Sequence, residues 1–148
     1  MNATVTVHDS CHTGRWAGLY DAPRKILSMI PGLKLSEMRH NRENSLCCRA
    51  VAMLSNPKIG LSIAVKRVRE AVEANADINV TNCSGCLSAL TFASHYSKAD
   101  VKVRDITDLL MEALGMQPEK TKERIISYME KAAKMLEGSR VTQGKQRL

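Results

Sequence analysis

Apolar and polar residues alternate along four short stretches of the chain, and this period of two is typical of β-strands. The predicted strands span residues 4–8, 33–38, 78–81 and 101–103. The first of them, from Thr4 to His8, is also rich in β-branched residues, which favour a pleated backbone. We therefore expect a sheet of four strands.

Between and after the strands, apolar residues recur at spacings of three and four, as in amphipathic helices. The predicted helices span residues 19–30, 57–74, 87–95, 106–114 and 119–136. The apolar face of the helix over 57–74 consists of Leu61, Ala64, Val65, Val68 and Val72. We expect the basic residues of this helix, Lys66, Arg67 and Arg69, to face solvent.

Strands and helices alternate in the order β-α-β-α-β-α-β-α-α, which predicts an α/β fold. The expected architecture is Rossmann-like, with a mostly parallel sheet and helices on both faces. Residues 1–116 form the predicted domain, and residues 117–138 form an extra C-terminal helix that packs on it or on a partner. This last helix is expected to bury Ile125, Met129, Ala132 and Leu136. Residues 139–148 are predicted to be a disordered tail.

The composition changes this picture little. A chain of 148 residues with 44% apolar residues can bury the core of one domain, and aromatic residues make up only 3%. The chain has no apolar run of the roughly 20 residues that would span a membrane. Its start also lacks the basic flank and apolar stretch of a signal peptide. We therefore expect a cytoplasmic protein, in which thiols stay reduced.

The formal net charge of +7 indicates a basic surface. Outside the helix over 57–74, much of this charge comes from Lys131, Lys134, Arg140, Lys145 and Arg147. A basic surface is compatible with nucleic-acid binding, but the chain has no recognition motif and few aromatic residues for stacking. The charge therefore favours a solvated helix face or an acidic protein partner over nucleic acid.

The five cysteines form one spaced pattern, C-x35-C-C-x34-C-x-x-C. They are Cys11, Cys47, Cys48, Cys83 and Cys86. Each of the three cysteine-bearing segments follows a predicted strand, and ligands of open α/β sheets gather beyond the carboxyl ends of strands. The last two cysteines also begin a predicted helix, whose positive N-terminus favours anionic ligands. Thiolates grouped in this way are typical ligands of iron–sulfur clusters or zinc, so the sequence predicts a metal site.

Two other interpretations of the cysteines remain open from the residues alone. The thiols are either buried and inert, or the C-x-x-C segment works as a thiol–disulfide centre without metal. The sequence contains no G-x-G-x-x-G, P-loop or nucleophile-elbow motif, so we expect no flavin, nucleotide or hydrolytic site in the chain itself.

The residues around the cysteines extend the pattern. The segment from His8 to Arg15 reads H-D-S-C-H-T-G-R, a Y-D-A-P-R segment follows at Tyr20, and N-R-E-N-S-L leads into the cysteine pair. Spacing and flanks together resemble the cysteine-rich CCG domain of heterodisulfide reductase subunits. They are also similar to related iron–sulfur subunits of glycolate and lactate oxidases. The resemblance covers about residues 4–114.

This resemblance implies an electron-transfer or redox subunit with a [4Fe-4S] cluster. The cluster would be cubane or noncubane, bound by Cys11, Cys47, Cys48, Cys83 and Cys86. It further implies disulfide reduction as the best-known activity, and flavin or iron–sulfur subunits as electron donors. Related chains generally carry two such domains, and the opening of this chain resembles the second. A second CCG-domain chain is therefore an expected partner, while a metal-stabilised docking module holding zinc or a cluster is the alternative.

The chain departs from the family pattern at two positions. Arg49 follows the cysteine pair where the family usually has glycine, and Ser84 stands where proline is common. The resemblance leads us to expect that Arg49 alters access to the cluster or its charge environment. A serine hydroxyl at position 84 would be able to hydrogen-bond a cluster sulfur.

Other polar residues near the cysteines are secondary candidates. His8 and Asp9 are expected to fix the loop after the first strand, and His12 is either an outer donor to the site or bonded to a loop carbonyl. Arg15, Arg42 and Arg49 either offset the charge of the site or belong to the general surface. These are the remaining side-chain predictions: Trp16 packs against the sheet edge, and His40 and His95 face solvent.

Overall fold

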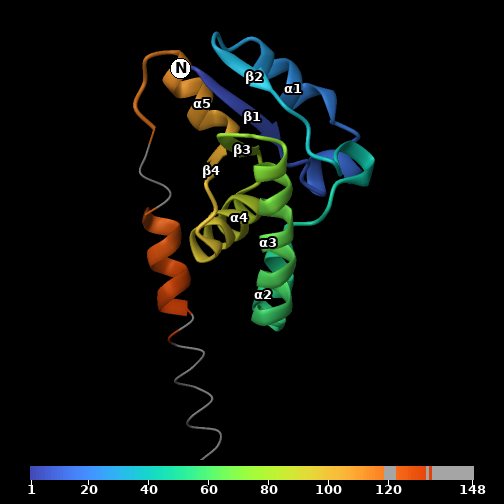
Figure 1. Cartoon of the computed structure of the whole chain (residues 1–148), viewed down its shortest axis with the longest axis vertical. Coiled ribbons are helices and arrows are strands. Elements are labelled where there is room, and N and C mark those ends of the chain that lie inside the picture. The colour runs from blue at the N-terminus through green and yellow to red at the C-terminus, as the bar shows by residue number, and fades with distance from the viewer. Residues whose placement is uncertain (119–122, 133, 135–148) are drawn as a thin grey trace, which may run out of the picture.

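The computed structural model describes residues 1–118, 123–132 and 134, and its centre is a sheet of four parallel strands (Figure 1). The strands are β1 (Ala3–Val7), β2 (Leu33–Leu35), β3 (Ile78–Thr81) and β4 (Lys102–Asp105), in the spatial order β2-β1-β3-β4. Val5 of β1 pairs with Leu35 on one side and with Ile78 on the other. The predicted α/β class and parallel sheet are confirmed.

Helices cover both faces of this sheet, as predicted (Figure 1). The helices are α1 (Asp21–Ser28), α2 (Ala50–Ser55), α3 (Pro57–Glu73), α4 (Ser84–Ser97) and α5 (Ile106–Ala113). A π-helical turn, η1 (His12–Trp16), and a 3-10 turn, η2 (Arg42–Asn44), lie between them. A further helix runs over 123–132. α1 and α5 share a core with one face of the sheet, and α2, α3 and α4 form a second core on the other side.

The first core is made of hydrocarbon side chains. Val5 and Val7 of β1, together with Ile78 and Val80 of β3, pack against α1 and α5. Leu27 of α1 and Leu109 of α5 are almost completely buried there. Neighbouring side chains of a strand point to opposite faces, so the intervening residues must face α3 and α4.

Those intervening residues are polar. Thr6 and His8 alternate with the two valines along β1 and just beyond its end. Asn79 and Thr81 alternate with the apolar residues of β3. All four of these polar residues are buried. Among the described residues, the side chains of Thr6, Asn79 and Thr81 have no hydrogen-bond partner. The second face of the sheet is therefore buried and polar at once.

Local sequence explains several element boundaries. Asn56 caps α3, because its Oδ1 accepts a hydrogen bond from the backbone N–H of Ile59, and Pro57 begins the helix. Asp105 caps α5 through the N–H of Thr107. Gly32, with φ of +83°, makes the turn before β2, where an added Cβ would lie 2.2 Å from the Met1 carbonyl oxygen. A residue with a side chain is excluded there.

Some boundaries differ from the predictions. β2 ends at Leu35 rather than at residue 38, and Glu37, beyond the end of the strand, pairs with Arg24. α1 begins at Asp21, which places Pro23 in its first turn. α2 was not predicted, since six residues are too few to display a helical period.

The prediction for the C-terminal helix is only partly confirmed. Residues 123–132 and 134 are helical, with Ile125 and Met129 half-buried, and Met129 packs against the second core. Ala132 is exposed, so its predicted burial is wrong. Leu136 and the predicted tail over 139–148 lie outside the described residues. The proposed division at residues 116 and 138 stays a prediction.

Candidate metal centre

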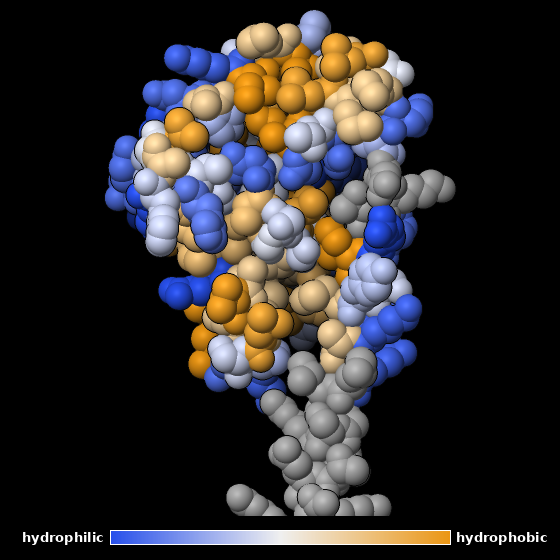
Figure 2. Space-filling model, turned by 180° about the vertical axis from the view of Figure 1, so that it is seen from behind, coloured by the Kyte–Doolittle hydropathy of each residue, from blue (hydrophilic) through white to orange (hydrophobic). Residues whose placement is uncertain are grey.

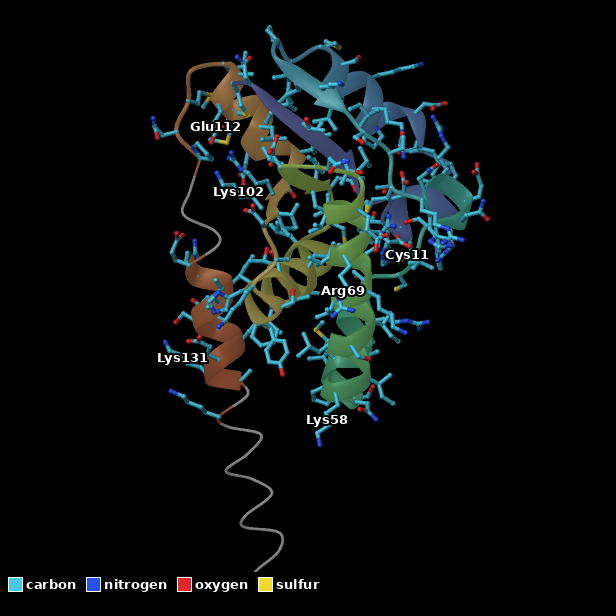
Figure 3. The ribbon with its side chains drawn as sticks, in the orientation of Figure 1. Cys11, Lys58, Arg69, Lys102, Glu112 and Lys131 are labelled. Carbon is cyan, nitrogen blue, oxygen red and sulfur yellow. The ribbon has the colours of Figure 1, made fainter. Side chains whose placement is uncertain are left out.

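The cysteines lie at the carboxyl end of the sheet, where the chain leaves the strands. Cys11 lies beyond the end of β1, at the start of η1 (Figure 3). Cys83 immediately precedes α4, after β3, and the pair at 47 and 48 precedes α2. Cys48 and Cys86 are buried, whereas Cys11, Cys47 and Cys83 are half-buried, and all five are free thiols. Two of the five cysteines are therefore buried, and the other three are partly accessible to solvent.

The buried pair is a hydrogen-bonded couple of sulfurs. The Sγ atoms of Cys48 and Cys86 are 3.2 Å apart. The contact with Cys86 lowers the pKa of Cys48 to about 4, against the opposing effect of burial. Cys48 in turn raises the pKa of Cys86, and burial adds to this effect. The contact thus favours the thiolate form of Cys48 over that of Cys86, and a thiolate is the form of cysteine that binds metals.

His8 joins this pair as a third potential donor. The imidazole of His8 and the sulfurs of Cys48 and Cys86 lie within 4.8 Å of one another. Burial lowers the pKa of His8, and the neighbouring Arg67 adds to that effect. From the sequence, His8 was expected only to fix the loop after the first strand. The alternation along the first strand could have predicted its position near the cysteines, because it places His8 on the polar face of the sheet at the carboxyl end.

Arg67 lies directly behind His8 and is completely buried, so the prediction that it faces solvent is wrong. Its Nε donates to Nδ1 of His8 at 3.1 Å, and its Nη1 donates to the carbonyl of His40 at 2.6 Å. Nη2 donates to Oγ of Ser45 at 3.1 Å, and Glu70 forms an ion pair with Nη1. A buried guanidinium needs such partners, and here they connect α3 to the segment that leads into the cysteine pair.

Glu70 links this buried group to the surface. Its second carboxylate oxygen contacts Nδ1 of His40, whose side chain is 39% exposed. The prediction that His40 simply faces solvent is therefore only partly right, because one side of the ring is bound. His95 on α4 is exposed, as predicted.

Asp9 fixes the loop after β1, as predicted. Its carboxylate accepts hydrogen bonds from Arg24 at 2.7 and 3.0 Å and from the backbone N–H of Arg42 at 2.7 Å. Although burial raises the pKa of Asp9, the bonds from Arg24 and Arg42 outweigh it and lower the pKa. One carboxylate thus joins the loop that carries Cys11 to the segment that precedes Cys47.

The arginines predicted near the site have different surroundings. Arg15 donates to the Ser45 carbonyl at 2.5 Å, and Arg42 pairs with Asp21 at 2.6 Å. Arg49 is exposed, and its backbone N–H contacts the Cys47 sulfur at 3.4 Å. Arg49 has φ of +59°, a left-handed conformation that glycine adopts without strain. This explains in physical terms why a glycine suits the position after the cysteine pair.

The side chains of His12 and Trp16 are both exposed in the turn that follows Cys11. Nδ1 of His12 is 3.6 Å from the Cys11 sulfur, and the His12 side chain is exposed. Trp16 is 87% exposed, so the prediction that it packs against the sheet edge is wrong. Ser84, also exposed, begins α4 beside Cys83.

An apolar groove of about 420 Å³ opens beside the cysteines. It lies between α2, α4 and the helix over 123–132, and Val51, Leu54, Phe92 and Met129 contribute to its walls. Apolar side chains gather around a hollow on this side of the molecule (Figure 2). Ala50 and Gly85, which neighbour the cysteine segments, line the same groove, so it adjoins the candidate metal site.

Comparison with known proteins adds to this geometry. Residues 5–91 match the model of a family described as CCG, cysteine-rich domain. Over 118 residues the chain is 40% identical to a subunit of the dihydromethanophenazine:CoB–CoM heterodisulfide reductase of Methanosarcina barkeri. The matched region is 78% of this chain and 29% of that relative. The chain therefore spans less than a third of the length of that protein.

Two bacterial relatives are also similar. The chain is 36% identical over 118 residues to the probable iron-sulfur-binding oxidoreductase FadF of Bacillus subtilis, covering 77% of this chain and 17% of that protein. It is 31% identical over 108 residues to lactate utilization protein A of Oceanobacillus iheyensis, covering 72% of this chain and 43% of that protein. Within the described part of the chain, no helix has both the length and the apolar character to cross a membrane.

Proposed function

Because the chain belongs to the CCG family of cysteine-rich domains, we propose that it is an iron–sulfur redox subunit of a heterodisulfide-reductase-like complex. In this proposal Cys11, Cys47, Cys48, Cys83 and Cys86 hold one cluster. The name of one relative includes heterodisulfide reductase, and that of another includes iron-sulfur-binding oxidoreductase. A bound iron–sulfur cluster would supply one-electron transfer.

The observation that carries the proposal is the contact between two buried cysteine sulfurs at the carboxyl end of the sheet. The 3.2 Å contact between Cys48 and Cys86 places two soft donors in a dry pocket, with one thiolate favoured. Cys83 shares the C-x-x-C segment with Cys86, so the proposal adds it to the same donor set. Within the described residues, Cys11, Cys47 and Cys83 stand outside the group whose donor atoms lie within 4.8 Å of one another, and all three are half-buried. The donor set fits a thiolate-bound cluster.

The buried and the half-buried cysteines would have different roles in such a site. Cys48 and Cys86 anchor it from the interior, where the core excludes water from the sulfurs. The half-buried Cys11, Cys47 and Cys83 leave one side open, through which a partner or substrate would approach. The backbone N–H of Arg49 donates a hydrogen bond to the Cys47 sulfur, which helps to hold that side chain in place.

The substrate and the partners are part of the same proposal. A disulfide is the proposed substrate class, because one relative is named as part of a heterodisulfide reductase. The matched region is only 29% of that relative, so the partners are proposed here for the cysteine-rich domain alone. We propose an electron-donating flavin or iron–sulfur protein and a second CCG-domain chain. Five free thiols favour a reducing compartment such as the cytoplasm.

A second candidate is a docking module stabilised by zinc. The close grouping of His8, Cys48 and Cys86 favours it, because imidazole and thiolate together are typical zinc ligands. Cys83 would complete a set of four. In this case the site stabilises the fold and performs no redox chemistry.

Metal analysis of the full chain purified without oxygen separates the two candidates. An iron–sulfur subunit is expected to be brown, with iron and acid-labile sulfide bound to each chain and an electron paramagnetic resonance signal after reduction. Stoichiometric zinc without sulfide would contradict the proposed redox function. Binding of purified candidate donor subunits, followed by reduction of the cluster, tests the role in electron transfer.

A further inference from the structure

We propose that His8 is a positioning residue that donates a hydrogen bond from Nε2–H to the Cys48 sulfur and does not bind the metal. This inference rests on the proposed function, because it assigns His8 a role toward a cluster held by Cys48 and Cys86. The main alternative is that His8 itself binds the metal, because its imidazole lies close to the sulfurs of Cys48 and Cys86.

Arg67 determines which nitrogen of His8 carries the proton. Its Nε–H lies 3.1 Å from Nδ1 of His8, and a guanidinium has only donors. Nδ1 must therefore accept, with its lone pair directed at Arg67. In an imidazolium both nitrogens are donors, so the contact requires a neutral ring with its proton on Nε2.

The guanidinium is not free to turn away from His8. Arg67 is completely buried, and its other nitrogens donate to the His40 carbonyl, to Ser45 Oγ and to Glu70. Breaking the contact with Nδ1 would leave a buried N–H without a partner, which destabilises the folded chain. Because these bonds hold Arg67 in place, Arg67 keeps His8 in the tautomer that has its proton on Nε2.

This arrangement is opposite to that of a metal-binding histidine. A ligating imidazole binds through its unprotonated nitrogen and usually donates its other N–H to a carboxylate or a carbonyl behind it. In this protein the unprotonated nitrogen of His8 faces Arg67, and the group behind the ring is a donor. Ligation through Nε2 would move the proton to Nδ1, where it would face the N–H of Arg67. The remaining role for Nε2–H is donation to Cys48, whose sulfur belongs to the same group of donor atoms within 4.8 Å of one another.

Such a bond would affect the redox behaviour of the site. A hydrogen bond to a cysteine sulfur draws negative charge from it and favours the reduced, more negative state of a cluster. His8 is 1% exposed, so no water replaces the bond when it is removed. Removing His12, which lies beside Cys11, should have a smaller effect on the potential, because His12 is exposed and water is able to take its place.

The first test is the tautomer of His8 in the full chain without metal. Two-bond proton–nitrogen correlation spectra of protein with labelled histidines distinguish Nε2–H from Nδ1–H, and His8→Gln identifies the signal. We expect the neutral Nε2–H form. A neutral Nδ1–H form or an imidazolium at neutral pH would overturn the inference. This result does not depend on whether a cluster binds, so it separates this inference from the proposed function.

The second test compares His8→Gln with His8→Leu after reconstitution with iron and sulfide. Glutamine presents an N–H near the position of Nε2, while leucine has none. We expect wild-type iron content in both variants, a reduction potential near wild type for glutamine and a more negative one for leucine. His95→Gln, on the exposed side of α4, is the matched control. Loss of iron in His8→Gln, or an unchanged potential in a folded His8→Leu, would contradict the role.

Discussion

The two faces of the central sheet differ in chemistry although they share the same strands. Val5 and Val7 of β1 face α1 and α5 in a core of hydrocarbon side chains. One residue along, Thr6 and His8 face the opposite side, where α3 contributes Arg67. The strand register is the same for both faces, so the difference comes entirely from the alternating side chains.

The comparison separates residues that stabilise the fold from residues that build the site. Burial of hydrocarbon stabilises the α1 and α5 side at about 25 cal/mol per Å² of apolar surface. The other side loses part of this gain, because buried polar groups such as the Asn79 side chain have no hydrogen-bond partner among the described residues. Its polar groups converge toward the carboxyl end, where the cysteines lie. The polar face supports the site at the expense of stability.

The largest expected effect is at the centre of the polar face. Replacing Arg67 with methionine leaves Glu70 buried and deprives His8, Ser45 and the His40 carbonyl of a donor. We expect the free energy of unfolding to fall by about 3–5 kcal/mol. Urea titration measures it. Arg69→Met is the matched control, because Arg69 lies on the outside of the same helix (Figure 3) and should change stability by less than about 0.5 kcal/mol. Equal effects of the two variants would contradict the assignment.

A hydrocarbon deletion on the other face tests whether the two faces act separately. Leu27→Ala empties a site that is 1% exposed and should cost about 2–5 kcal/mol in urea unfolding. Under conditions in which the variant stays folded, we expect its iron content to match wild type. Met29→Ala, at a position 78% exposed, is the control for stability. Loss of iron from folded Leu27→Ala would show that the faces are coupled.

A smaller effect is expected at the strained residue beside the cysteine pair. Arg49 has φ of +59°, so Arg49→Gly relieves a left-handed conformation and should stabilise the metal-free chain by about 1 kcal/mol. Lys98→Gly, with φ of +52° at the end of α4, is a matched variant away from the cysteines. Urea titration of both variants is the measurement. Destabilisation by Arg49→Gly alone would show that the arginine side chain supports the site.

The smallest effect concerns an ion pair at the edge of the sheet, in contrast to the buried pair of Arg67. The hydrogen bond from Arg104 lowers the pKa of Glu112, at a separation of 2.7 Å. The stabilisation is therefore present above the ordinary pKa of glutamate and is lost as the pH falls below it. Glu112→Gln should cost about 0.2–1 kcal/mol at pH 7 and less at pH 3. Thermal unfolding at the two pH values checks this, and a larger cost at pH 3 would contradict it.

Much of the fold was predictable because its signals are local and periodic. Alternation located the strands, and their parallel order brought the cysteine segments to one edge. The burial of Arg67 was not predictable, since a basic residue on a helix normally faces solvent and its partners come from distant segments. The contact between His8 and Arg67 was not predictable for the same reason, because the two residues are 59 positions apart in the sequence.

The central claim is that the buried couple and the more open cysteines form one iron–sulfur site. The direct test is the iron and sulfide content of Cys48→Ser and Cys86→Ser chains purified without oxygen, beside Cys11→Ser and wild type. Ser94→Ala, a buried hydroxyl of α4 away from the site, controls for destabilisation. We expect both buried-pair variants to lose the cluster, Cys11→Ser to hold less iron, and Ser94→Ala to match wild type. Wild-type iron content in Cys48→Ser and Cys86→Ser would contradict the account.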